Sequence, residues 1–277
     1  MNPDVRNIPY GSHERQVLDI YSASANEPGP VLIFLHGGGY IGGDKSDIQS
    51  FPLLSICLDA GITVISANYR FITSHPFPAP MEDGTRVIQW VRHHAGDYGW
   101  DPAKIALSGS SAGAHISLWN AMKGDLSKPD SEDPVERCPS TVSAVISYDG
   151  QVTKDQHFYK KYDLGNRLQP NLLLFYGIVS EEELEHPDIR KLSYEASAIN
   201  FVSAEAPPVL TIYGLDFGPV PFLEDTPVSE IIHHPLHGSF LKEEMAKYGR
   251  TCLLRHAGDP VCEGELLQFL REAFQRV

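Results

Sequence analysis

The stretch that decides the fold is Ile105-Ala-Leu-Ser-Gly-Ser-Ser-Ala-Gly-Ala114. Within it, residues 109–113 fit G-x-S-x-G, the pattern of a nucleophile elbow, in which a serine lies at the tip of a sharp strand-to-helix turn. The two glycines let the strand and the helix pack closely, so that Ser111 is exposed to a substrate carbonyl. The N–H of Ala112 points to the same place and can stabilise an oxyanion. Ser111 is therefore the predicted nucleophile.

The flanks of this stretch favour the same interpretation. G-x-S-x-G alone is a weak pattern, because glycine, serine and alanine are common residues. Here, however, residues 104–108 are typical of a short buried strand, and residues 112–122 carry apolar side chains near helical spacing. This context favours an elbow over the alternative, a glycine-rich turn without chemical function.

Composition limits the remaining possibilities. A chain of 277 residues is predicted to form one large domain over residues 1–277. The formal net charge of −14 argues against nucleic acid or an anionic membrane surface as a partner. The first residues show no apolar segment typical of a secretory signal, and no apolar run could span a bilayer, so a cytoplasmic location is expected. The four cysteines lack metal-ligand spacing, and we expect no metal site.

The order of predicted elements indicates an α/β protein. Residues 5–10 and 16–21 read as a hairpin, and short apolar runs that follow it read as strands. Helical patterns separate most of these strands, so we expect a mostly parallel central sheet with helices on both faces. The predicted strands are 31–35, 63–67, 104–108, 141–148, 207–213 and 251–255, and the predicted helices are 50–60, 81–94, 112–122, 240–247 and 264–276.

Two long segments interrupt this alternation. Residues 120–138 are polar and are expected to cross the surface. Residues 151–206 are polar and aromatic, then apolar, then acidic. An insert of this length between core strands often covers the end of a sheet, so we predict a cap or lid; an ordinary surface insert is the alternative.

A second chemical motif is His36-Gly-Gly-Gly39, which directly follows the predicted strand 31–35. An oxyanion hole needs backbone N–H groups that approach the substrate closely, and glycine permits that approach. A glycine run after a buried strand, upstream of a nucleophile elbow, is typical of the oxyanion loop in lipases and esterases. Gly38 and Gly39 are therefore the predicted donors, together with Ala112.

At this point the sequence resembles the α/β-hydrolase superfamily, and within it the hormone-sensitive-lipase-like and feruloyl-esterase-like carboxylesterases. The resemblance is dense from about residue 30 to residue 120. It rests on His36-Gly-Gly-Gly39, Ala67-Asn-Tyr-Arg70, Phe77-Pro-Ala-Pro80 with Asp83, Tyr98-Gly-Trp-Asp-Pro102 and Gly109-Ser-Ser-Ala-Gly113. It implies an α/β-hydrolase fold and covalent acyl transfer, in which a serine attacks an ester, a histidine moves its proton and an acid orients the histidine.

The resemblance assigns the acid to the turn after residues 207–213. The family pattern there is Gly-x-x-Asp, but Phe217 occupies the acid's position and Asp216 lies one residue earlier. We predict Asp216 as the acid. Asp149, which follows the strand after the elbow, is the alternative, and a role for Asp216 in capping the turn is a third interpretation.

The base departs further from the family pattern. The family places its histidine in the loop after the last strand, where this chain has Asp259. His256, three residues earlier, is the predicted substitute. His237 is the second candidate, and His233 and His234 lie on the unusual segment 222–236.

Three hypotheses follow from these residues. The first is a serine carboxylesterase that acts on small acyl or aryl esters and needs no cofactor. The second is a degenerate hydrolase that has lost its triad and binds a ligand or partner. The third is a lactone or amide hydrolase at the same site. The complete oxyanion loop and elbow favour the first, and the departures at Phe217 and Asp259 favour the second.

Overall fold

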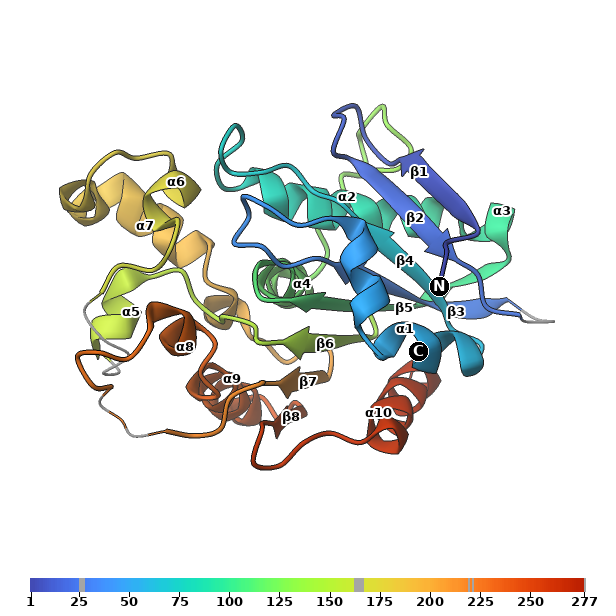
Figure 1. Cartoon of the computed structure of the whole chain (residues 1–277). Coiled ribbons are helices and arrows are strands. Elements are labelled where there is room, and N and C mark those ends of the chain that lie inside the picture. Colours follow the sequence, from blue (N-terminus) through green and yellow to red (C-terminus); the bar gives the residue numbers. More distant parts are fainter. Residues whose placement is uncertain (25–27, 162–166, 219, 221, 277) are drawn as a thin grey trace.

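A computed structural model describes residues 1–24, 28–161, 167–218, 220 and 222–276. At its centre is a sheet with the strand order β1-β2-β4-β3-β5-β6-β7-β8 (Figure 1). β2 runs antiparallel to both β1 and β4, and all other neighbouring strands are parallel. The strands are β1 (Val5–Pro9), β2 (Val17–Tyr21), β3 (Gly29–Leu35), β4 (Thr63–Ala67), β5 (Trp100–Ser110), β6 (Ala144–Tyr148), β7 (Val209–Ile212) and β8 (Cys252–Arg255).

Helices cover both faces of this sheet, because the central strands are apolar on both sides. Along β3, Val31, Ile33 and Leu35 join one buried cluster, while Leu32 and Phe34 join the other. The first cluster includes side chains of α2 (Ala79–His93), α4 (Ala112–Lys123) and α9 (Leu236–Lys247). The second includes side chains of α1 (Leu53–Asp59) and α10 (Glu263–Gln275). The predicted α/β architecture is confirmed.

Several element boundaries differ from the sequence-based predictions. The predicted helix 50–60 is two elements, the 3-10 helix η1 (Lys45–Ser50) and α1, with Pro52 at the N-cap of α1. The predicted helix 240–247 begins earlier, at Leu236, because Pro235 provides a helical N-cap that cannot extend the helix backward. The predicted strand 104–108 is the central part of the longer β5.

The segment between β6 and β7 folds into short helices. They are α5 (Gln156–Lys161), α6 (Leu172–Tyr176), η2 (Glu181–Glu185), α7 (Pro187–Glu195) and η3 (Ala198–Phe201). Part of the predicted insert, residues 162–166, lies outside the described residues. Figure 1 places α5, α6 and α7 on the side of the molecule where α8 (Val228–Ile232) also lies. A lid role for residues 151–206 within one domain stays a prediction.

One further short helix and one long connection complete the described chain. α3 (Ala95–Tyr98) joins α2 to β5, and the connection from residue 124 to residue 143 contains neither helix nor strand. No helix in the described part of the chain is both long and apolar enough to cross a membrane.

One buried carboxylate ties three separate segments together. Asp83 on α2 is 1% exposed. Its Oδ1 lies 2.7 Å from the Arg70 guanidinium and accepts a 2.7 Å hydrogen bond from Gln16, while Oδ2 accepts one from the Arg70 backbone N–H. Asp83 therefore links α2 to the chain that follows β4 and to the turn before β2.

Replacement of Asp83 with alanine would leave Arg70 and Gln16 without their buried acceptor. We expect Asp83→Ala to lower the free energy of unfolding by about 3–5 kcal/mol, the usual cost of breaking a buried ion pair. Urea denaturation measures this change. The control is Asp97→Ala, which removes an exposed carboxylate paired with His94 and should cost less than about 1 kcal/mol. Equal losses in the two variants would refute the role of Asp83.

Candidate active site

Ser111 lies at the turn between β5 and α4, where the G-x-S-x-G motif predicts an elbow. Its backbone has φ 49° and ψ −110°, a conformation that costs a non-glycine residue about 1–3 kcal/mol. The flanking glycines make the close approach possible. A Cβ on Gly113 would lie 2.0 Å from the Leu35 carbonyl oxygen, and a Cβ on Gly109 would lie 2.4 Å from the Gly113 carbonyl carbon. The elbow therefore has no room for a side chain at either position.

The hydroxyl of Ser111 has a histidine partner. Ser111 Oγ lies 2.9 Å from Nε2 of His233, which follows the last residue of α8. This is the distance at which an imidazole can accept a hydroxyl proton. Of the four histidines considered from the sequence, the structure thus brings His233 to the nucleophile.

Burial sets the protonation of His233. Removal from water lowers the pKa of this imidazole, and the positive charge of Lys154 lowers it further. The carboxylate of Asp149 and a hydrogen bond with the Ser229 backbone oppose this shift by stabilising the imidazolium. Since the net pKa lies below the usual value for histidine, His233 is mainly neutral at neutral pH. A neutral imidazole is the form that can act as a general base.

Asp149, the alternative acid considered from the sequence, lies close to the elbow. It directly follows β6, whose residue Tyr148 pairs with Ser110, so it lies beside the elbow. Its backbone has a positive φ of 52°, and its Oδ1 accepts a 2.8 Å hydrogen bond from the N–H of Gly214. The carboxylate is therefore held in place at the carboxyl ends of β6 and β7.

Asp216 and His256, the predicted acid and base, contact each other. His256 Nδ1 lies 2.7 Å from Asp216 Oδ1, and the ring of Phe217 packs edge-on against His256 with centroids 4.9 Å apart. Within the described residues, the recorded partner of the Ser111 hydroxyl is His233 and not His256. The structure thus forms the Asp216–His256 pair but gives Ser111 a different histidine.

The two remaining candidate histidines have other contacts. The two ring nitrogens of His234 each lie 3.2 Å from a backbone nitrogen, that of Gly218 at Nε2 and that of Leu236 at Nδ1, and the neutral ring can accept a hydrogen bond from one of them. His237 is fully buried, and its Nε2 lies 3.1 Å from the hydroxyl of Tyr159. Both therefore help to fold the segment around His233 rather than meeting the nucleophile.

The glycine loop after β3 lies against the elbow. Leu35 pairs with Gly109, and a Cβ on Gly37 would lie 3.2 Å from the carbonyl oxygen of Ser110. Gly38 and Gly39 have φ values of 98° and 60°, which side chains rarely adopt, and a Cβ on Gly38 would lie 2.3 Å from the Gly42 carbonyl oxygen. This shape is one that only glycines fit well.

Contacts from three directions hold this loop. Tyr69 donates a 2.9 Å hydrogen bond to the His36 carbonyl, and Asn171 from the insert donates one of 3.1 Å to the Gly39 carbonyl. The hydroxyl of Tyr40 lies 2.7 Å from His115 Nδ1, one turn into α4. The loop therefore has a fixed position relative to Ser111.

A buried lysine adds a charge that the sequence pattern did not reveal. Lys154, shortly after β6, is 5% exposed, and its ammonium donates to Gln151 Oε1 and lies 4.9 Å from the centroid of the Tyr40 ring. Burial lowers its pKa to about 7. No carboxylate among the described residues forms an ion pair with it. Its charge therefore acts on its histidine neighbours, His115, His233 and His237.

The chain is similar to proteins of one hydrolase family. The BD-FAE family model matches residues 18–225. The esterase LipQ of Mycobacterium tuberculosis is 31% identical over 216 residues, which are 75% of this chain and 48% of LipQ. The esterase LipC of the same organism is 29% identical over 216 residues, 76% of this chain and 50% of LipC. The chain thus spans about half the length of these curated relatives.

Solved structures share the fold over nearly the whole chain. A truncated carbohydrate esterase from gut microbiota superposes with a TM-score of 0.76 at 22% identity, covering 98% of this chain and 96% of that one. A propionate-bound esterase from Thermogutta terrifontis gives a TM-score of 0.64 at 21% identity, covering 98% and 92%. No group of three or more potential metal ligands occurs among the residues that the structure describes.

The charge of Lys154 makes a pH-dependent prediction. In Lys154→Met the positive charge near His233 is lost, so the imidazolium is less disfavoured and the pKa of His233 rises. Because the base must be neutral, we expect the acid limb of the kcat/KM profile on p-nitrophenyl acetate to move to higher pH.

The control is Lys191→Met on α7. Lys191 is exposed and is not among the groups that shift the pKa of His233, so this substitution removes a positive charge without acting on that histidine. Its profile should match wild type. A Lys154→Met profile that is unmoved, or moved to lower pH, would contradict the electrostatic role of Lys154.

Proposed function

This chain belongs to the BD-FAE family of α/β-hydrolases, and we propose that it hydrolyses carboxylic esters through an acyl-enzyme on Ser111. The observation that carries the proposal is the 2.9 Å contact between Ser111 Oγ and His233 Nε2 at a strained elbow. A hydroxyl becomes a useful nucleophile only when a base can take its proton, and this contact supplies the base. It argues against the degenerate-hydrolase hypothesis.

In the proposed first half-reaction, Ser111 Oγ bonds to the ester carbonyl carbon while its proton passes to His233 Nε2. The oxyanion accepts hydrogen bonds from the backbone N–H groups of Gly38, Gly39 and Ala112. The bond to the alcohol oxygen then breaks, and His233 returns the proton to the departing alcohol. In the second half, His233 deprotonates a water that attacks the acyl carbon; the bond between Ser111 Oγ and that carbon then breaks, His233 returns the proton to Oγ, and the carboxylic acid leaves.

Asp149 is the acid that this geometry favours. Its negative charge stabilises the imidazolium that forms on His233 during each half-reaction. In this proposal Asp216 and His256 do not exchange protons with substrate. They form a pair beside Phe217 that supports the loops around the site.

For the substrate we propose small acyl or aryl esters. The insert brings Phe175 within 5.1 Å of the Tyr40 ring, centroid to centroid, next to the oxyanion loop. Phe77 stacks on Phe175 with centroids 5.4 Å apart. Tyr40 and Phe175 are 2% and 1% exposed, so these rings form the packed apolar support behind the oxyanion loop and do not themselves contact the ester. The cytoplasmic location expected from the sequence stays a prediction.

Ser111 is tested with a fluorophosphonate probe, which modifies a serine that has an active base. We expect wild type to be labelled and to hydrolyse p-nitrophenyl acetate, while Ser111→Ala does neither. The control is Ser110→Ala, which alters the neighbouring hydroxyl of the same turn and should keep labelling. If wild type shows neither labelling nor turnover from about pH 5 to about pH 9, the esterase proposal is excluded.

The base is located by comparing two alanine variants. We expect His233→Ala to lower kcat by roughly 10³-fold or more, as loss of a catalytic base does in serine hydrolases. His256→Ala should retain most of kcat, because its recorded partner is Asp216. The reverse result, with His256→Ala inactive and His233→Ala active, would restore the assignment expected from sequence.

A further inference from the structure

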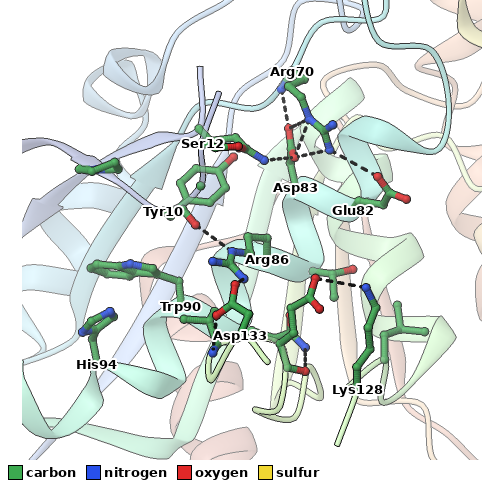
Figure 2. A pocket seen from close by; sticks show the side chains of 18 of the residues that line it. Tyr10, Ser12, Arg70, Glu82, Asp83, Arg86, Trp90, His94, Lys128 and Asp133 are labelled. Carbon is green, nitrogen blue, oxygen red and sulfur yellow. Dashed lines mark hydrogen bonds and ion pairs between the residues drawn. The ribbon is translucent and has the colours of Figure 1, made fainter. Parts of the chain in front are cut away.

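A second cavity lies away from Ser111. It has a volume of about 900 Å³ and lies between the β1–β2 turn, helix α2 and the connection that follows α4 (Figure 2). Its described lining includes no residue of the elbow, the oxyanion loop or α8. The α4 residue in this lining is Trp119, which is eight residues beyond Ser111, or about 12 Å along the helix. The volume falls in the range of ligand sites, ~300–1,000 Å³.

Aromatic side chains form the rigid part of this cavity. Tyr10, Trp90 and Trp119 are 1%, 6% and 7% exposed, so their positions are set by packing. The polar groups of two of them already have protein partners. The Tyr10 hydroxyl donates to the Asn68 carbonyl, and the Trp119 N–H donates to the Glu195 carbonyl. At these exposures the rings form the closed inner wall of the cavity and offer a ligand only a small part of their surface.

Paired charges line the rest of the cavity, as Figure 2 shows. Arg70 pairs with Asp83 and Glu82, Arg86 lies 2.5 Å from Asp133, and Lys128 lies 3.2 Å from Glu136. Three cations thus face four carboxylates. The side chains of Lys128 and Glu82 remain 68% and 60% exposed, so they keep hydrogen-bonding capacity toward a ligand.

This balance restricts the ligand. The four carboxylates outnumber the three basic groups, which disfavours an anion, and a cation would have to compete with the basic groups that already pair with these carboxylates. A wholly apolar ligand would displace water from the ion pairs and could not replace the hydrogen bonds that this water makes with them. A neutral ligand with many hydroxyl groups avoids these costs, because each hydroxyl can both donate to a carboxylate and accept from a basic group.

We propose that this cavity binds an uncharged oligosaccharide. Its hydroxyls would bond to the outward atoms of the ion pairs at the rim, chiefly to the exposed side chains of Glu82 and Lys128. Binding here needs no ester and no chemistry at Ser111. The site would hold a glycan chain apart from the position where an ester is cleaved.

The test is a titration of the full chain with xylotetraose, a neutral oligosaccharide, followed by tryptophan fluorescence and by calorimetry. We expect saturable binding with a Kd on the order of 1 mM or tighter. A tetramer of galacturonic acid and a tetramer of chitosan serve as the anionic and cationic comparators, and each should bind at least ~10-fold more weakly. Equal binding of either charged oligomer would overturn the assignment to uncharged sugars.

Two variants locate the binding. Ser12→Trp places a large side chain at an exposed position of the rim, and the pair Glu82→Ala with Lys128→Ala removes exposed hydrogen-bonding groups. Both should weaken xylotetraose binding by at least ~10-fold, while Lys191→Ala on α7 leaves it unchanged. Hydrolysis of p-nitrophenyl acetate should stay at the wild-type level in all of them. Unchanged affinity in both cavity variants, or no saturable binding in wild type, would overturn the proposal whether or not the chain proves to be an esterase.

Discussion

The positive φ of Ser111 is the constraint on which the site depends. An alanine or larger residue at Gly109 or Gly113 would collide with backbone atoms. Strand β5 and helix α4 can therefore pack this closely at the elbow only with glycine at both positions. That approach also fixes the oxyanion loop, because β3 pairs with β5 up to Leu35 and Gly109. The sheet register therefore sets the relative positions of Ser111 and the glycine loop, and packing over both faces of the sheet must offset the backbone strain.

The activating half of the site has a different origin. His233 comes from a segment between β7 and α9, whereas β8, after which the family pattern places its histidine, is followed by His256 and then Asp259. A histidine on this segment can still serve as a base, because catalysis requires a suitable distance between the imidazole and the serine hydroxyl and a neutral imidazole, not a fixed position in the chain. Asp149 and Lys154 act on that protonation state with opposite charges.

One side of helix α4 connects the site with the second cavity, because residues four positions apart lie on the same face of a helix. His115, one turn after Ser111, contacts Tyr40 beside the oxyanion loop, and Trp119, a further turn on, lines the cavity next to α2. Asp83 and Arg70 at the cavity's edge also tie α2 to the sheet. The helix that follows Ser111 therefore also shapes a second surface, and the inner wall of the cavity, at Tyr10, Trp90 and Trp119, belongs to the core.

The sequence by itself determined the α/β architecture, the elbow at Ser111 and the glycine loop at Gly38 and Gly39, since these rest on local backbone requirements that glycine spacing and apolar runs express directly. It left open which acid and which histidine serve Ser111. Only the tertiary structure brought His233 to the serine and joined His256 to Asp216, and only it showed the burial of Lys154. The serine and His233 are 122 positions apart, and spacing at that separation carries no information on distance.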